Sequence, residues 1–172
     1  MTVRLLEPGP AGPDIVEGLA AVLLHAVGDG VSAGFLAPLA PRVATDWWTQ
    51  ALRRPDARTW IALQAGKIVG CVRLVPDASE TGSHRAEVAK FLVLRTAQGR
   101  GHGRALLAAL EQHAAATGRW LLTLDTETGT PAEAMYERWG WRRYGHLEDH
   151  AARPDGVLAP STFFVKRLRG AR

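Results

Sequence analysis

Apolar and polar residues recur along the chain with two different spacings, and the change of spacing outlines the secondary structure. VRLL at Val3 is a short apolar strand, and Pro13-Asp14 opens a helix that runs to about Val27. A second helix is expected for RVATDWWTQALRR from Arg42. TWIAL and KIVGCVRLV, joined by Ala65-Gly66, instead read as a hairpin of two strands.

The second half of the chain continues this alternation of strands and helices. AEVAKFLVL from Ala86 predicts a third long strand, and after a glycine-rich turn a helix carries one apolar stripe: Leu106, Leu107, Leu110 and Ala114. RWLLTLD is expected to be the next strand. Thr130 and Pro131 open a helix, with Glu133 three residues after the expected N-cap, and Gly140 ends it. WRRYGHL and STFFVKRL close the chain as strands, so we expect an α/β fold, a mixed sheet flanked by helices.

Composition narrows the class of protein. The 172 residues fit one domain, 1–172, and Cys71 is the only cysteine, so a disulfide framework is excluded and a cytoplasmic setting is expected. The net charge of +4 comes from 18 Arg and 3 Lys against 17 acids, but the basic residues are scattered. We therefore expect no nucleic-acid partner. No signal peptide or membrane-length apolar run is visible, and His146 and His150 lack a third metal ligand, so neither a membrane nor a metal is predicted.

The glycines of QGRGHG, residues 98–103, lie between a strand and a helix, where a backbone can bind an anion. A dinucleotide fingerprint would need Gly at position 104, which is Arg104, and no G-K-[ST] follows to make a Walker loop. The remaining mechanism is a backbone nest in which free amides at the helix start bind a phosphate group. The glycines alone are equally compatible with a turn that binds no ligand.

Several motifs together resemble a known family. Gln98-x-x-Gly101-x-Gly103, after FLVL and before an apolar helix, resembles motif A of the Gcn5-related N-acetyltransferases, and AEAMYERWGW from Ala132 resembles their second motif. GVSAGFLAPL, HRAEVAKFLVL, LDTETGTPAEAMY and PDGVLAPSTFFVK further resemble the tabtoxin-resistance branch. The resemblance implies a mixed, mostly antiparallel seven-stranded sheet with four helices, split between the fourth and fifth strands.

The resemblance also implies acetyl-CoA as acetyl donor, bound in that split. Backbone groups of Phe91, Leu92 and Val93 would pair with the pantetheine amides as an added strand does. The pyrophosphate would lie on a second set of residues: Gln98, Gly99, Arg100, Gly101, His102, Gly103 and Arg104. Arg100 or Arg104 would add charge, and the His102 side chain is expected to face solvent. Arg95 and Gly129 stand where many relatives have Pro and Asn, and the missing Asn removes a pantetheine partner.

Three residues fit the chemistry that the resemblance implies. An amine must lose a proton before it attacks a thioester, and Glu87 and Asp125 are the expected proton acceptors, directly or through water. Tyr136 would protonate the CoA thiolate, and the Val93 amide would bind the oxyanion. The structural alternatives are a solvated strand carboxylate for Glu87, a turn residue for Asp125 and a core aromatic for Tyr136. Which carboxylate is the base stays open.

The acceptor is expected to be a small-molecule amine, a toxin or antibiotic among the possibilities, bound by Phe35, Glu87 and Asp125. A protein or peptide amine is the alternative acceptor, and a non-catalytic acyl-CoA-binding module is the alternative function. The segment from Gly28 to Pro38 carries apolar residues unusual for a solvated link, so it is either a lid or a loop tucked against the sheet. We expect a monomer or a homodimer.

Overall fold

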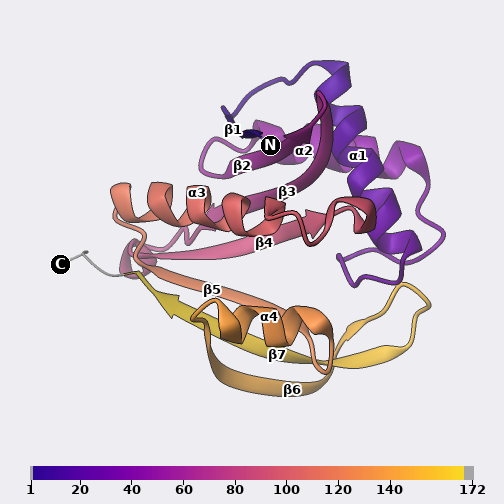
Figure 1. The fold of residues 1–172 in the computed structure, drawn as a ribbon. Helices are drawn as coiled ribbons and strands as arrows, with labels where there is room; N and C mark the ends of the chain where they lie inside the picture. The colour runs from indigo at the N-terminus through magenta and orange to yellow at the C-terminus, as the bar shows by residue number, and fades with distance from the viewer. Residues whose placement is uncertain (1, 169–172) are drawn as a thin grey trace.

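A computed structural model describes residues 2–168 of the chain. One twisted sheet carries helices on both faces (Figure 1). In chain order the elements are β1 (Thr2–Leu6), α1 (Pro13–Gly28), α2 (Pro41–Arg53), β2 (Arg58–Gln64), β3 (Lys67–Pro76), β4 (Arg85–Val93), α3 (His102–Ala116), β5 (Leu121–Glu127), α4 (Pro131–Arg138), β6 (Arg142–Ala152) and β7 (Leu158–Arg167). Two short 3₁₀ turns, Glu80–Gly82 and Arg95–Ala97, flank β4.

The sheet has seven strands in the order β1-β2-β3-β4-β5-β7-β6. All neighbouring strands are antiparallel except β4 and β5. This confirms the expected mixed, mostly antiparallel seven-stranded sheet with four helices. Among the helices of residues 2–168, none combines the length and apolar character that crossing a bilayer requires.

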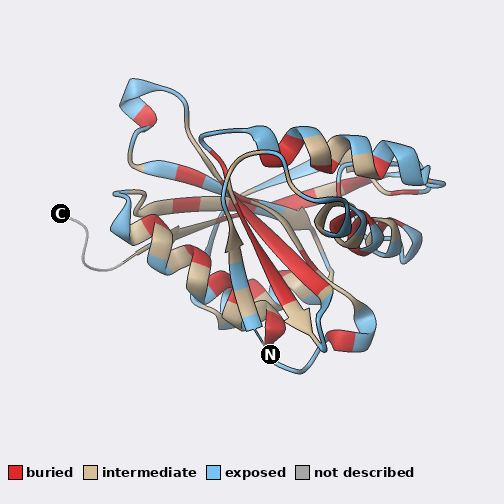
Figure 2. Cartoon of the chain, turned by 90° about the horizontal axis from the view of Figure 1, so that it is seen from above, coloured by how far each residue is buried: buried red, intermediate tan, exposed pale blue. Residues whose placement is uncertain are grey.

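Strands β2 and β3 are buried on both faces because helices cover each side (Figure 2). Ile61 and Cys71 face the core formed with α1 and α2, whereas their neighbours Trp60 and Val72 face the core formed with α3 and α4. Since successive strand residues point to opposite faces, the two cores are filled by alternate residues of the same strands. The predicted stripe of α3 belongs to the second core, with all four of its members buried: Leu106, Leu107, Leu110 and Ala114.

The hairpin of β2 and β3 forms at the predicted turn. Ala65 and Gly66 have φ angles of 49° and 77°. Two successive residues with positive φ make the type of two-residue turn whose twist matches that of paired strands. The glycine meets this requirement without steric cost, and Ala65 accepts the left-handed conformation beside it.

Strands β4 and β5 separate soon after they meet. Three residue pairs join them, and the last is Glu87 with Thr123. Beyond this point β4 pairs with β3 and β5 pairs with β7. The predicted split between the fourth and fifth strands is therefore present.

Three strands differ in length or position from the sequence prediction. β5 lies two residues further along than RWLLTLD, and β6 and β7 extend beyond WRRYGHL and STFFVKRL. The extended parts, residues 148–152 and 158–160, pair mainly with each other and are largely exposed on β6. A bulge between Leu147 and Ala151, with Asp149 at φ 52°, interrupts the regular alternation. The two-residue period that would reveal these strands is therefore absent from the sequence.

Candidate active site

A cleft of about 1450 Å³ lies where β4 and β5 separate. Its walls come from the α1–α2 loop, from β4, from the glycine-rich turn before α3, from the end of β5 and from α4. Most of the residues that the sequence singled out line it: Phe35, Glu87, Phe91, Leu92, Val93, Gln98, Gly99, Gly101, His102, Gly103, Arg104, Asp125 and Tyr136. Arg100 is not among the lining residues.

The glycine-rich turn presents free backbone amides to the cleft. Gly99 and Gly101 have φ angles of 73° and 83°, which residues with a Cβ rarely adopt. Gly101 is the N-cap of α3 and no side chain caps the helix. Because the amide of Ala105 donates to the Gly101 carbonyl at 3.0 Å, the three amides of the preceding first turn have no intrahelical acceptor. Together with the positive end of the helix dipole, they form a site suited to a phosphate group.

Gly103 is required for a different reason. A Cβ built at this position would lie 3.0 Å from Cζ of Phe91 and 3.5 Å from the Trp139 ring. The missing side chain lets α3 approach the ring of Phe91 on β4. Gly99 and Gly101 are therefore needed for their positive φ angles, and Gly103 is needed for the close contact between α3 and β4.

The His102 side chain does not face solvent, and this expectation was wrong. The residue is 3 % exposed, and its Nε2 lies 3.0 Å from Oε1 of Gln64 on β2. As the first residue of α3, it directs its ring to the sheet rather than to the cleft. The backbone amide of His102 remains the part of the residue that belongs to the predicted phosphate site.

On β4, successive residues of the predicted cofactor edge face opposite cores. Phe91 and Val93 pack against the α3 and α4 core, and Leu92 lies in the α1 and α2 core. The Gln98 side-chain amide donates to the Val93 carbonyl at 3.1 Å. Gln98 therefore holds the turn against the end of β4, a role additional to the one expected for its backbone.

Glu87 and Asp125 lie on the same face of the sheet. Their neighbours Ala86, Val88, Leu122 and Leu124 all belong to the core with α3 and α4. Because side chains alternate along a strand, both carboxylates face the α1 and α2 side. Both residues are exposed and line the cleft, Asp125 just beyond the last β4–β5 pair.

Tyr136 reaches the cleft from the other side of the sheet. It is 6 % exposed and packs among three aromatic rings: Phe91 at 6.2 Å, Trp141 at 5.9 Å and Phe164 at 5.6 Å between centroids. Burial, together with the charge of Asp125, raises the pKa of Tyr136 well above its usual value. The phenol is therefore protonated at neutral pH. The two carboxylates, Glu87 and Asp125, lie on the opposite face of the sheet.

The start of α4 is organised by Glu133. Its carboxylate accepts from the Gly129 amide at 2.8 Å and from the Thr162 hydroxyl at 2.7 Å, and it lies 3.1 Å from the Arg143 guanidinium. These contacts, the Thr162 bond first, lower the pKa of Glu133. The predicted N-cap Thr130 is confirmed by position, although its hydroxyl donates to the Glu127 carbonyl instead of capping the helix.

The α1–α2 loop is attached to the connection between β6 and β7. The Ser32 hydroxyl donates to the Ala152 carbonyl at 3.2 Å, and the Ala37 amide donates to the Pro154 carbonyl at 2.8 Å. Through these two bonds the loop contacts residues 152 and 154, and it also forms one wall of the cleft.

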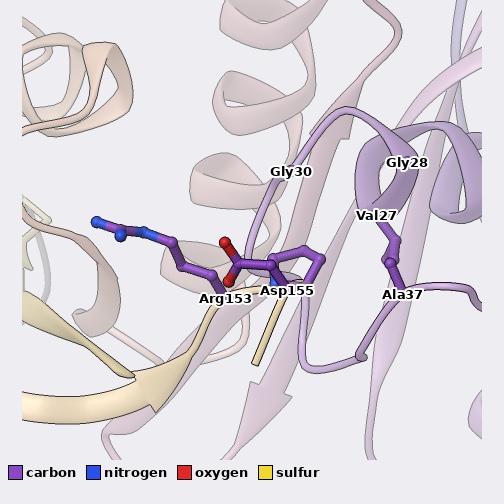
Figure 3. A pocket seen from close by; sticks show the side chains of 7 residues that line it. Val27, Gly28, Gly30, Ala37, Arg153 and Asp155 are labelled. Atoms are coloured by element: carbon purple, nitrogen blue, oxygen red, sulfur yellow. The ribbon is translucent and has the colours of Figure 1, made fainter. Parts of the chain in front are cut away.

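A second cavity, of about 260 Å³, lies between the end of α1 and this connection (Figure 3). The Arg153 side chain extends away from the α1 end, and its Nε lies 2.7 Å from Oε1 of Glu127 at the end of β5. No group of three potential metal ligands occurs within residues 2–168. His146 instead lies 2.8 Å from Glu148, and the His150 ring packs on Phe163.

Sequence reasoning missed Lys90, which lines the same cleft. Lys90 has a φ of 49° and sits at a bulge in β4, where the register with β3 shifts between Cys71 and Arg73. Regular alternation would place it on the face of Val88, toward α3. The bulge turns it to the opposite face, beside Glu87, and a strand pattern alone does not reveal such a shift.

Comparison with known proteins agrees with this architecture. The model of the acetyltransferase (GNAT) family matches residues 29–141. An IAA acetyltransferase of Azospirillum brasilense is 32 % identical over 106 residues, which are 61 % of this chain and 67 % of that protein.

Two solved structures share the fold over nearly their whole length. A ribosomal-protein-alanine N-acetyltransferase of Brucella melitensis has a TM-score of 0.80 at 24 % identity, over 98 % of this chain and 100 % of its own. A putative acetyltransferase of Salmonella typhimurium, solved with its cofactor acetyl-CoA, has a TM-score of 0.79 at 18 % identity, over 100 % and 96 % of the two chains. The family match, the split sheet and the free amides at the start of α3 together show that this chain belongs to the GNAT family of acetyltransferases, whose acetyl donor is acetyl-CoA.

Proposed function

We propose that the protein is an N-acetyltransferase that moves the acetyl group of acetyl-CoA to the primary amine of a small molecule, by direct attack while both substrates are bound. The observation that carries this proposal is the split itself. It joins the free backbone amides of the glycine-rich turn and Tyr136, on the α3 and α4 side, to Glu87 and Asp125, on the opposite side. Donor and acceptor can therefore enter from different faces and meet between the strands.

The donor side is built mainly from backbone. The edge of β4 at Phe91 to Val93 no longer pairs with β5, so its amides and carbonyls can bind pantetheine as an added strand does. The amides from Gly99 to Arg104 bind the pyrophosphate, and Arg104, which lines the cleft, adds positive charge. The Gly129 amide does not donate a hydrogen bond to pantetheine, because it already donates to the Glu133 carboxylate.

The acceptor side removes a proton. A lysine-like amine has a reference pKa of about 10.4, so at neutral pH it must lose a proton before it attacks. Glu87 and Asp125 face the same side of the cleft and receive this proton, directly or through a shared water. The Val93 amide stabilises the oxyanion that forms on the thioester carbon, and acetyl transfer releases CoA thiolate.

Tyr136 stabilises the departing thiolate. A simple thiol has a pKa of about 8.5, whereas the Tyr136 pKa lies above the ordinary value for tyrosine. Complete proton transfer from the phenol to the thiolate would therefore be uphill. A hydrogen bond donated by the phenol, with the proton supplied afterwards from water, is the role that the buried environment favours.

Two alternatives, a different acceptor class and a non-catalytic function, are distinguished by the experiment described below. The structural neighbour from Brucella melitensis acts, by its name, on a ribosomal protein alanine, so a peptide amine is the second acceptor class. A non-catalytic acyl-CoA-binding module is the second function class. The sequence motifs that resemble the tabtoxin-resistance branch favour the small molecule.

The test is release of free thiol from acetyl-CoA with a panel of small primary amines and of short peptides with free N-termini. Turnover with small amines supports the proposal, and mass spectrometry of the product would locate the acetyl group on nitrogen. Turnover restricted to peptides would replace the acceptor class. Tight CoA binding with no turnover on any amine would leave the binding module.

A further inference from the structure

Lys90 lies at the acceptor end of the cleft, in a position that the β4 bulge creates. Its neighbour Ala89 pairs with Arg73, and Leu92 pairs with Cys71, so one extra residue is accommodated between them. Lysine at a φ of 49° is unfavourable relative to glycine. The bulge therefore presents a charged side chain on the acceptor face at some conformational cost.

Aromatic rings surround the Lys90 ammonium. Nζ lies 4.9 Å from the centroid of the Trp47 ring and 6.0 Å from that of Phe35, and these rings pack edge to face at 5.9 Å. A Cβ built on Gly34 would lie 3.6 Å from Nζ. The ammonium is thus held between the α1–α2 loop and α2, at the wall of the cleft.

No carboxylate neutralises this ammonium within residues 2–168. Glu87 and Asp125 are the acids whose charge acts on Lys90, and neither lies within 4.0 Å of Nζ. Lys166 provides a contrast, since its ammonium contacts the Glu111 carboxylate at 2.7 Å and the Trp139 carbonyl at 3.0 Å.

A second cation increases the positive charge. The Arg73 guanidinium lies 5.5 Å from the same Trp47 ring, and the residue is 4 % exposed. It donates to the Ala51 carbonyl at 2.7 Å, while its Nε has no partner. Burial lowers the pKa of Lys90, and the charge of Arg73 lowers it further. Glu87 and Asp125 act on Lys90 from a distance, so its ammonium has no direct carboxylate partner, and the cation–π contacts offset only part of its desolvation.

We propose that Lys90 binds a carboxylate of the acceptor, so that the acceptor is an amino acid or a related amine that carries a carboxylate. This inference rests on the proposed N-acetyltransferase function. The amine end of such an acceptor lies toward Glu87 and Asp125, and its carboxylate lies against Lys90 on the Trp47 and Phe35 rings. The two ends of the acceptor therefore meet opposite charges on one face of the cleft.

The first experiment compares matched acceptors: amino acids with aliphatic, thioether and aromatic side chains, each beside its primary amide. An amide has the lower amine pKa, so a preference for the acid would run against intrinsic amine reactivity. We expect wild-type kcat/KM to favour the acids by about tenfold or more, the size expected for a hydrogen bond between charged groups. Lys90→Met should abolish this preference, and Lys90→Arg should keep part of it. Lys67→Met, at the exposed start of β3 outside the cleft, is the matched control.

The second experiment does not need turnover. Protein saturated with CoA is titrated with amine-free carboxylates, from propionate to hexanoate and 3-phenylpropionate, and binding is measured by calorimetry. Binding that falls about tenfold or more in Lys90→Met, but not in Lys67→Met, supports the subsite. If it does so while no amine is acetylated, the proposed function fails and the subsite stands.

Two results would overturn the inference. The first is wild-type turnover of amides at least equal to that of the acids, which would leave an acetyltransferase without a carboxylate subsite. The second is carboxylate binding that is absent, or equal in wild type and Lys90→Met. Far-ultraviolet circular dichroism of each variant shows whether it is folded, and Lys90→Arg provides the test if Lys90→Met is not.

Discussion

Glu87 of β4 pairs with Thr123 of β5 at the last rung of the parallel junction in the sheet. Asp125 follows two residues later on the same face, where the strands have already separated. The end of one backbone ladder therefore opens the cleft and places the two carboxylates at its entrance.

The carboxylates should act as one unit. Glu87→Gln and Asp125→Asn should each lower turnover, and the double variant should be little slower than the slower single variant, because residues that serve one proton path give non-additive losses. Steady-state kcat and kcat/KM of the three variants make the measurement. Glu17→Gln and Asp14→Asn, on the exposed start of α1, are the controls. Losses that multiply would assign the two residues independent roles.

Replacing Tyr136 by Phe should lower kcat by roughly 10²-fold, the loss usual when one preorganised hydrogen-bond donor to a developing negative charge is removed. The ring packing with Phe91, Trp141 and Phe164 is kept, so CoA affinity and thermal stability should change little. Stopped-time thiol release and calorimetric titration with CoA provide the two readouts. Tyr144→Phe, at an exposed position of β6, is the matched control. A Tyr136→Phe enzyme as fast as wild type would make the residue a packing aromatic.

Charge at the start of α3 should weaken CoA binding. Gly101 has a φ of 83° and open space around its Cβ position, so Asn and Asp meet similar backbone strain there. Gly101→Asp adds a carboxylate that competes with the pyrophosphate for the free amides, whereas Gly101→Asn does not add charge. We expect the Asp variant to bind CoA at least about tenfold more weakly than the Asn variant, as one lost charge-assisted contact implies. Equal CoA affinities in calorimetry would remove the phosphate site from this turn.

Glu133 should stabilise the fold above acidic pH. Its folded-state pKa is lowered from a reference of 4.5, so its contribution is present above that value and is lost as pH falls through the lower, folded-state pKa. Glu133→Gln should therefore reduce the free energy of unfolding near pH 7 by about 1–3 kcal/mol, because the Gly129, Thr162 and Arg143 contacts lose a buried charged acceptor.

Urea unfolding of Glu133→Gln at several pH values makes that measurement. The acid limb of the stability profile should be flatter than in wild type. Glu137→Gln is the control on the same helix, because this carboxylate also contacts Arg143 but is exposed. A difference between wild type and Glu133→Gln that does not vary with pH would show that the charge of Glu133 is not what stabilises the start of α4.

The features that depend on neighbours in the chain could be predicted from the amino-acid sequence. The stripe from Leu106 to Ala114 has the spacing of one helix face, Ala65-Gly66 supplies a two-residue turn, and Thr130-Pro131 opens a helix. Each of these signals reflects a local conformational preference or a period of one element, so no distant residue is needed to interpret it. The glycine-rich turn belongs to the same class, because a free helix start follows directly from it.

The features that depend on which face a side chain occupies are fixed only when the sheet is assembled. The His102 ring turns inward because Gln64 of β2 lies within reach, and Lys90 moves to the α1 and α2 face because the β4 bulge interrupts the alternation. The outer parts of β6 and β7 pair with each other beyond the rest of the sheet. Because β6 is largely exposed there, burial does not impose a two-residue pattern on its sequence. In each case the partner is distant in sequence, and a register shift of one residue reverses a side chain's direction, so only the assembled sheet determines the result.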